Sequence, residues 1–207
     1  DIDGNPRPNR ALIILLGGVP GVGKTTVGNA LLSSMGLTHH ISTGFLRAAI
    51  EEFLPLSNAS LLRKRAFDAY EMLEGPNVSP GESLILEGCI AQAELLKPVF
   101  KACIGRARRE GIGLVLEGSH FIPGIIDPSE YDADLLCVLD VPDRDELQTR
   151  ALSSNHLNRT MSSFDLQRMV QLQDQILFMA RKHNYPIIKN INLKEAIHHI
   201  RGLSQIP

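Results

Sequence analysis

Residues 18–25 read Gly18-Val19-Pro20-Gly21-Val22-Gly23-Lys24-Thr25. The pattern Gly-x-x-x-x-Gly-Lys-Thr forms a phosphate-binding loop when a strand precedes it and a helix follows it. Ahead of the loop, residues 11–16 are continuously apolar, as in a strand that is buried on both faces. After it, apolar residues recur at helical spacing until Gly36, a typical helix stop. The chain is therefore expected to open with a strand, a glycine loop and a helix.

The residue types in this loop suit the binding of a nucleoside triphosphate. Glycines let the backbone curl so that amide N–H groups point at phosphate oxygens, and the start of the following helix adds its positive dipole end. Lys24 is expected to reach the β and γ phosphates, and the Thr25 hydroxyl is expected to bind Mg²⁺. We predict that ATP and Mg²⁺ are bound by Gly18, Val19, Pro20, Gly21, Val22, Gly23, Lys24, Thr25 and Thr26.

Further apolar runs alternate with amphipathic stretches along the chain. Strands are expected at residues 113–118, 134–140 and 186–189, with a fifth at 39–41. Helices are expected at 83–110, with a break near Pro98, and at 165–183 and 193–203. Strands that alternate with helices predict an α/β fold with a five-stranded, mainly parallel sheet flanked by helices, in a domain spanning residues 11–207.

Two similar stretches need different assignments. Leu84-Ile85-Leu86-Glu87-Gly88 resembles Leu114-Val115-Leu116-Glu117-Gly118. The first continues into further helical spacing without a turn, so it is expected to be helical. The second is preceded by Gly111 and bounded like a strand. Glu117, rather than Glu87, is thus expected to end a central strand beside the phosphate loop.

Composition narrows the class of protein. The 207 residues carry 43% hydrophobic and 21% charged side chains with a net charge of −2, which is ordinary for one soluble globular domain. This charge does not favour a nucleic-acid partner, and no apolar run is long enough to span a membrane. The three cysteines are widely spaced, so a reducing, cytoplasmic location is expected. Residues 1–10 are expected to be a flexible leader, and the oligomeric state is left open.

Other features favour a small-molecule kinase over a switch or motor protein. No Asn-Lys-x-Asp sequence is present to read guanine, and arginines cluster in a polar stretch after the strand at 134–140. Nucleoside-monophosphate-kinase-like proteins have a lid here whose arginines neutralise the transferring phosphoryl group. We expect a lid at about residues 144–163, with Arg150 and Arg159 catalytic and Arg144 on the surface. His39 and His40 have no partner at metal-ligand spacing and are expected to be structural.

Four stretches, taken in order, resemble the 2-phosphoglycerate kinases. The phosphate loop is the first. Ile41-Ser42-Thr43-Gly44-Phe45-Leu46-Arg47 resembles that family's Ser-Thr-Asp-x-x-Arg. Leu116-Glu117-Gly118-Ser119-His120-Phe121-Ile122-Pro123-Gly124 resembles its Glu-Gly-x-His-x-x-Pro-Gly, the most specific of the four. His183-Asn184-Tyr185-Pro186-Ile187-Ile188-Lys189-Asn190 resembles its closing Asn-x-Pro-x-x-x-Asn.

The resemblance implies transfer of the γ-phosphoryl group of ATP to the free hydroxyl of 2-phosphoglycerate, giving 2,3-bisphosphoglycerate. The acceptor would be an anionic small molecule, and Thr43, Arg47 and His120 are the residues expected to bind it. Arginine suits this task because it clamps phosphate or carboxylate with two hydrogen bonds. Lys24 and Glu117 are expected to be catalytic, with Glu117 orienting magnesium-bound water or accepting the acceptor's proton.

Two departures from the family keep alternatives open. Gly44 stands where the family has an aspartate that contacts magnesium or the acceptor hydroxyl in related kinases. The fold could therefore serve another acceptor, such as a sugar or polyol phosphate or a nucleic-acid 5′-hydroxyl, or a regulatory module that binds ATP without transfer. Archaeal members also carry an additional N-terminal nucleotide-sensing domain. This chain begins ten residues before the first expected strand, so that regulation is expected to be absent or to have been cut away.

Overall fold

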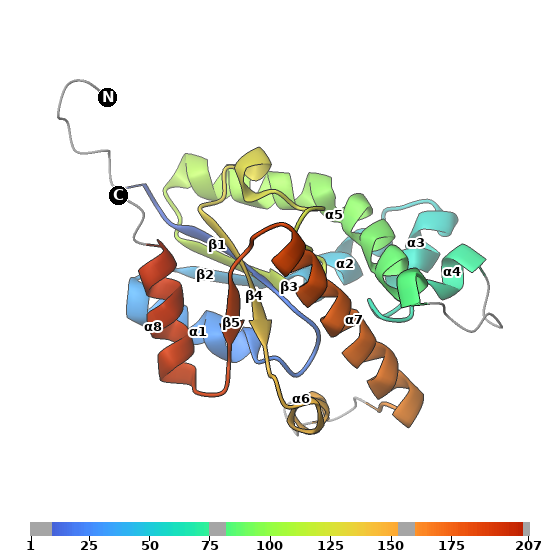
Figure 1. Cartoon of the computed structure of the whole chain (residues 1–207). Helices are drawn as coiled ribbons and strands as arrows, with labels where there is room; N and C mark the ends of the chain where they lie inside the picture. The colour runs from blue at the N-terminus through green and yellow to red at the C-terminus, as the bar shows by residue number, and fades with distance from the viewer. Residues whose placement is uncertain (1–9, 75–81, 153–159, 205–207) are drawn as a thin grey trace.

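The computed structural model describes residues 10–74, 82–152 and 160–204 (Figure 1). The expected leader therefore lies almost wholly outside the described residues, as do Arg159 and most of the polar part of the expected lid. The strands are β1 (Ile13–Gly17), β2 (His39–Ser42), β3 (Leu114–Gly118), β4 (Leu135–Asp140) and β5 (Ile187–Lys189). The helices are α1 (Lys24–Met35), α2 (Thr43–Glu51), α3 (Leu56–Arg63), α4 (Glu71–Glu74), α5 (Glu82–Glu110), the 3-10 turn η1 (Pro128–Tyr131), α6 (Arg144–Ala151), α7 (Ser163–Lys182) and α8 (Leu193–Ser204).

The five strands form one parallel sheet in the order β2-β3-β1-β4-β5. This confirms the predicted α/β class and the five predicted strands. The first strand lies at the centre, and its neighbours on both sides arrive later in the sequence by helical crossovers. In such a sheet the carboxyl ends of all strands share one edge, so the loops after β1, β2 and β3 meet there.

Each face of the sheet is covered by a separate hydrophobic core. Because side chains alternate along a strand, Ile14 and Leu16 face one core and Ile13 and Leu15 face the other. The first core receives apolar residues from α1, α7 and α8, and the second receives them from α5 (Figure 1). All four strand residues are fully buried, which explains the continuous apolar run seen in the sequence.

The predicted break at Pro98 is wrong, because α5 is one helix of 29 residues with Pro98 inside it. A proline in a helix removes one backbone hydrogen bond and costs about 3 kcal/mol. Here Leu96, Phe100 and Ile104 are fully buried against the sheet on both sides of Pro98. Burial of three large side chains offsets the cost, since packing rather than propensity holds most protein helices.

The sequence predicts no element between β2 and α5, and this segment folds as the three helices α2, α3 and α4. They lie to the right of the sheet in Figure 1, where α3 and α4 contact α5. The stretch 84–88 is helical, as predicted, and forms part of α5. Within residues 10–74, 82–152 and 160–204, no helix has the length and apolar character needed to cross a membrane.

Candidate functional site

A cleft of ≈ 1300 Å³ lies at the carboxyl ends of the strands. Its walls come from the phosphate loop, the start of α2, the loop after β3, the segment after α3 and the loop after β5. Pockets for one small ligand usually measure about 300–1,000 Å³. The cleft therefore has room for two ligands side by side.

The phosphate loop has the backbone shape that its sequence predicts. Gly18, Gly21 and Gly23 have φ angles of 131°, 91° and 87°, in the region that favours glycine. Gly23 precedes α1 directly, so the loop delivers the chain to the positive end of that helix. Lys24 Nζ donates a hydrogen bond of 2.9 Å to the carbonyl of Val19, across the loop. The loop is thus folded back on itself at the cleft floor.

Two buried side chains fasten this loop to the body of the protein. Gln173 Oε1 accepts a hydrogen bond of 3.0 Å from the Val19 amide, and Gln173 Nε2 donates to the Leu139 carbonyl at 2.9 Å. The Ser119 hydroxyl donates to the Gly18 carbonyl at 3.1 Å. Sequence reasoning missed Gln173, although one signal was available: a glutamine stands on the apolar, core-facing stripe of α7.

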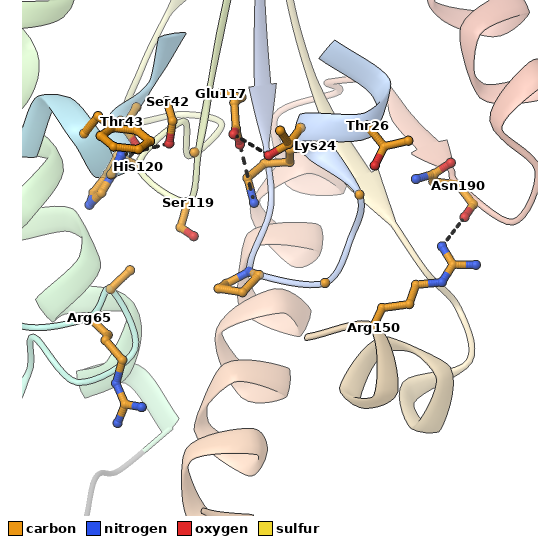
Figure 2. Close-up of a pocket in the computed structure, with 18 of the residues that line it drawn as sticks. Lys24, Thr26, Ser42, Thr43, Arg65, Glu117, Ser119, His120, Arg150 and Asn190 are labelled. Carbon is orange, nitrogen blue, oxygen red and sulfur yellow. Dashed lines mark hydrogen bonds and ion pairs between the residues drawn. The ribbon is translucent and has the colours of Figure 1, made fainter. Parts of the chain in front are cut away.

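Glu117 faces the first turn of α1 at the centre of the cleft. The Thr25 hydroxyl donates a hydrogen bond of 2.9 Å to its Oε1, and Lys24 Nζ lies 3.8 Å from its Oε2 (Figure 2). The residue is only 4% exposed. The carboxylate, the hydroxyl and the ammonium group that were separate predictions from sequence are therefore brought into one cluster.

This cluster fits a magnesium ion that is bound mainly by phosphates. Mg²⁺ prefers oxygen ligands and typically takes one or two protein carboxylates or hydroxyls, with water and phosphate oxygens completing its shell. Thr25 and Glu117 supply such oxygens next to the phosphate loop. A group of three or more His, Cys, Asp or Glu side chains able to enclose a metal is not found in the described part of the chain.

His40 also lines the cleft, although it was expected to be only structural. Its Nε2 lies 3.9 Å from Glu117 Oε1, and its Nδ1 shares a hydrogen bond of 3.0 Å with Asn29 Oδ1. Burial lowers the pKa of His40, and the nearby Glu117 carboxylate opposes this shift only in part. Burial therefore favours the neutral form of this ring beside the carboxylate.

His120 takes part in a buried chain of hydrogen bonds with Thr43 and Gln92. Gln92 Nε2 donates to backbone carbonyls, so its Oε1 is the acceptor for His120 Nε2–H at 3.0 Å. His120 Nδ1 then accepts from the Thr43 hydroxyl at 2.8 Å. Burial, with Arg47 and Lys24 nearby, lowers the pKa of His120 to about 3. The expected donation from His120 to the acceptor would require one of these bonds to break.

The glycine after Glu117 is explained by Thr43. A Cβ atom on Gly118 would lie 1.7 Å from the Thr43 hydroxyl oxygen. The start of α2 therefore packs directly on the end of β3, and only glycine permits the contact. This close approach places Thr43 and Gly44 at the cleft wall beside Glu117.

Arg47 lines the cleft, as expected for an acceptor-binding residue, but part of its guanidinium is already engaged. Its Nη1 donates hydrogen bonds to the carbonyls of Leu62 and Lys64 at the end of α3. Burial lowers the pKa of Arg47 from its ordinary value. The residue thus braces the end of α3 while it lines the cleft.

The remaining arginines are divided between the cleft and the surface. Arg150 lines the cleft near Thr26 and Asn190, and its Nη1 donates to the Asn190 carbonyl at 2.9 Å (Figure 2). Arg144 pairs with Asp140 at 2.9 Å and with Asp174 at 2.6 Å, outside the cleft lining. Arg65, which sequence reasoning missed, lines the cleft on the side opposite Arg150 (Figure 2).

Curated proteins similar to this chain are named 2-phosphoglycerate kinase. Those of Pyrococcus horikoshii and Thermococcus kodakarensis are 28% identical over 189 and 191 residues, and that of Methanothermobacter thermautotrophicus is 30% identical over 195 residues. Each alignment covers 90% of this chain and 62–63% of the relative. The chain therefore spans about three fifths of the length of these relatives. No protein-family model matches it.

Solved structures support the fold. A shikimate kinase from Bacteroides thetaiotaomicron superposes with a TM-score of 0.52 and 15% identity, covering 94% of this chain and 99% of that one. A gluconokinase from Sinorhizobium meliloti gives 0.51 and 17% identity, covering 96% and 94%. The chain thus has the fold of the small P-loop kinases, and its resemblance to the 2-phosphoglycerate kinases is confirmed across nine tenths of its length.

Proposed function

We propose that this protein transfers the γ-phosphoryl group of ATP to the hydroxyl of a small phosphorylated acid, with 2-phosphoglycerate as the acceptor. The observation that carries the proposal is the contact between Thr25 and Glu117 beside Lys24. It places a metal-binding hydroxyl, a carboxylate and a phosphate-binding lysine together in a cleft with room for two ligands. The choice of 2-phosphoglycerate as the acceptor rests on the names of the similar proteins.

The cleft divides into two sides around this cluster (Figure 2). Thr26, Arg150 and Asn190 lie on one side, next to the start of α1, where a nucleoside attached to loop-bound phosphates would extend. Thr43, His120 and Arg65 lie on the other side. We assign the first side to ATP and the second to the acceptor, so that the γ-phosphate and the acceptor hydroxyl meet near Lys24 and Glu117.

The residues would serve the transfer mainly by position and charge. In the reaction the acceptor oxygen forms a bond to the γ-phosphorus, the bond from that phosphorus to the ADP oxygen breaks, and the hydroxyl loses its proton. Lys24 and the loop amides would hold the negative charge that moves onto the leaving oxygen. Magnesium, when bound, neutralises phosphate charge. Glu117 would orient the hydroxyl and take up its proton.

A second candidate function is nucleotide binding without transfer, and Gly44 favours it. Glu117 is the only carboxylate among the cleft-lining residues that the structure describes, and it is already bonded to Thr25. The family aspartate would add a second carboxylate at the start of α2, where Gly44 is exposed. A base of modest strength suffices for phosphoryl transfer, so we rank the kinase first.

The test is transfer from γ-labelled ATP across a panel of acceptors. The panel contains 2-phosphoglycerate, 3-phosphoglycerate, glycerate, glycerol 2-phosphate, an inositol phosphate and a 5′-hydroxyl oligonucleotide. We expect labelled product with 2-phosphoglycerate. If only another acceptor gives product, the assignment of 2-phosphoglycerate as the acceptor is wrong. If ATP binds but no acceptor gives product, the second candidate function is favoured.

We also propose that the protein works in the reducing cytoplasm, which its three free cysteines fit.

A further inference from the structure

Arg65 stands on the acceptor side of the cleft, in the segment that follows α3. Together with Ala66 and Phe67 it forms part of the cleft wall, and its side chain is 42% exposed. Its guanidinium carbon lies 4.7 Å from the centre of the Phe67 ring, a stacking arrangement that restricts its rotation. It is therefore an accessible arginine with a defined orientation.

Two carboxylates bind this guanidinium. Nε donates to Asp68, and Nη2 donates to Asp165 at 2.6 Å. Arg168 pairs with the same two carboxylates, at 2.9 Å and 2.5 Å, which closes a ring of two arginines and two aspartates. Among the described residues, no hydrogen-bond partner is found for Nη1 of Arg65. The ring of ion pairs therefore holds Nε and Nη2 of Arg65 and leaves Nη1 for a ligand.

The backbone that carries Arg65 is also held in place. Gln92 Nε2 donates to the carbonyls of Leu61 and Lys64 at 2.7 Å and 2.9 Å. Arg47 donates to the carbonyls of Leu62 and Lys64. Since Gln92 also accepts from His120, the end of α3 is tied to the loop after β3. Arg65 is therefore positioned relative to the reacting centre before a ligand arrives.

Arg65 and Arg47, the two arginines assigned to the acceptor side, differ in how far nearby carboxylates cancel their charge. Arg65 and Arg168 carry two positive charges that Asp68 and Asp165 cancel, so the ring offers directed N–H donors with little net charge. Arg47 donates its hydrogen bonds to neutral carbonyls and forms no salt bridge with a described carboxylate, so only the more distant Glu51 carboxylate acts against its charge. A dianion gains most from a cation whose charge no close carboxylate cancels, whereas a monoanion can be held by directed N–H donors.

We propose that Arg65 binds the carboxylate of the acceptor, while Arg47 binds its phosphate. The protein would then select acceptors that carry both a phosphate and a carboxylate. This inference rests on the proposed function, because it concerns the acceptor of the same reaction.

The test compares two acceptors that differ only at the group assigned to Arg65. Glycerol 2-phosphate has a hydroxymethyl group in place of the carboxylate of 2-phosphoglycerate. Kinetics with both acceptors would be measured for wild type, Arg65→Gln, Arg65→Lys and the control Arg63→Gln. Arg63 is an exposed neighbour that does not line the cleft. Binding of 2-phosphoglycerate would be measured separately by calorimetry with a non-hydrolysable ATP analogue.

We expect Arg65→Gln to raise KM and Kd for 2-phosphoglycerate about 10- to 100-fold, the range for loss of a charge-assisted hydrogen bond. Its effect on glycerol 2-phosphate should stay below about threefold, Arg65→Lys should recover part of the loss, and Arg63→Gln should match wild type. Equal losses with both acceptors, or no loss with either, would overturn the role of Arg65.

The two proposals can be told apart by their failures. If wild type binds 2-phosphoglycerate without transferring phosphate, the proposed function fails, and the Kd ratio of Arg65→Gln to wild type still decides the role of Arg65. If wild type transfers phosphate but the variant loses both acceptors equally, only the role of Arg65 fails. If wild type neither binds nor phosphorylates 2-phosphoglycerate, both are overturned.

Discussion

The hydroxyl of Thr25 donates a hydrogen bond of 2.9 Å to Oε1 of Glu117. The two residues are 92 positions apart in sequence, and they meet because β1 and β3 are parallel neighbours with Gly17 opposite Gly118. The strand ends thus bring the first turn of α1 and the end of β3 to the same point.

Glu117→Gln should lower kcat about 100-fold or more, because the amide removes the negative charge that serves magnesium and the acceptor proton. Binding of magnesium-free ATP should change little. Titration of Mg²⁺ in the kinase assay gives the measurement. Thr25→Ser keeps the hydroxyl and serves as the matched control. Thr25→Ala removes the hydroxyl and, like Glu117→Gln, should raise the Mg²⁺ concentration needed for half-maximal activity. If Glu117→Gln turns over as fast as wild type, the proposed catalytic role of Glu117 is wrong.

Lys24→Ala should abolish detectable transfer while the fold survives. The side chain contacts the Val19 carbonyl and Glu117 at the cleft rather than the apolar cores, and its charge would serve the phosphates. Steady-state kinetics and circular dichroism are the measurements. Lys97→Ala, on α5 and paired with Glu94 at the surface, is the control and should retain activity. Retained turnover in Lys24→Ala would contradict the mechanism.

Gly44→Asp tests whether a second carboxylate at the start of α2 aids transfer. A Cβ atom there would meet only the Ser42 hydroxyl, at 3.3 Å, so the substitution needs a small shift of one side chain. We expect an unchanged melting temperature and a kcat raised about tenfold or more, as for an added general base. Gly44→Asn is the uncharged control. An unchanged kcat would show that Glu117 suffices.

His120 should make the protein less stable in acid. Its pKa is about 3 in the folded state, against an ordinary value of 6.5. Above pH 6.5 the ring is neutral in both states and has no effect. As the pH falls below 6.5, the unfolded chain takes up a proton that the folded chain cannot. Stability should therefore drop by up to about 1.4 kcal/mol per pH unit, until pH 3.

The acid effect is measured by urea unfolding at pH 7 and pH 5. His120→Gln should lose about 2 kcal/mol less than wild type between these values, because glutamine does not titrate. His199→Gln, an exposed histidine on α8, is the control and should follow wild type. Equal losses in all three proteins would show that His120 becomes protonated in the folded state.

Local sequence was sufficient for the phosphate loop and the strands. The glycines at 18, 21 and 23 permit the positive φ angles of the loop, and the apolar run before them is buried as a strand. Both properties depend on residues that are close together in the sequence. The acidic end of β3 was also recognisable, because Glu117 interrupts an apolar run just before a glycine. The choice of helix for residues 84–88 succeeded for the same reason: the spacing beyond them continued unbroken.

Only the tertiary structure decided which of these residues act together. Pro98 stays within α5 because buried neighbours on both sides offset its local penalty, which no local pattern expresses. Gln173, Gln92 and Arg65 looked like ordinary polar residues, since they have partners as far as 154, 31 and 100 positions away, respectively. The sequence by itself determined that a phosphate loop follows a buried strand. The side chains that surround this loop were decided by long-range packing, because hydrogen bonds and ion pairs form only after the sheet has brought their partners together.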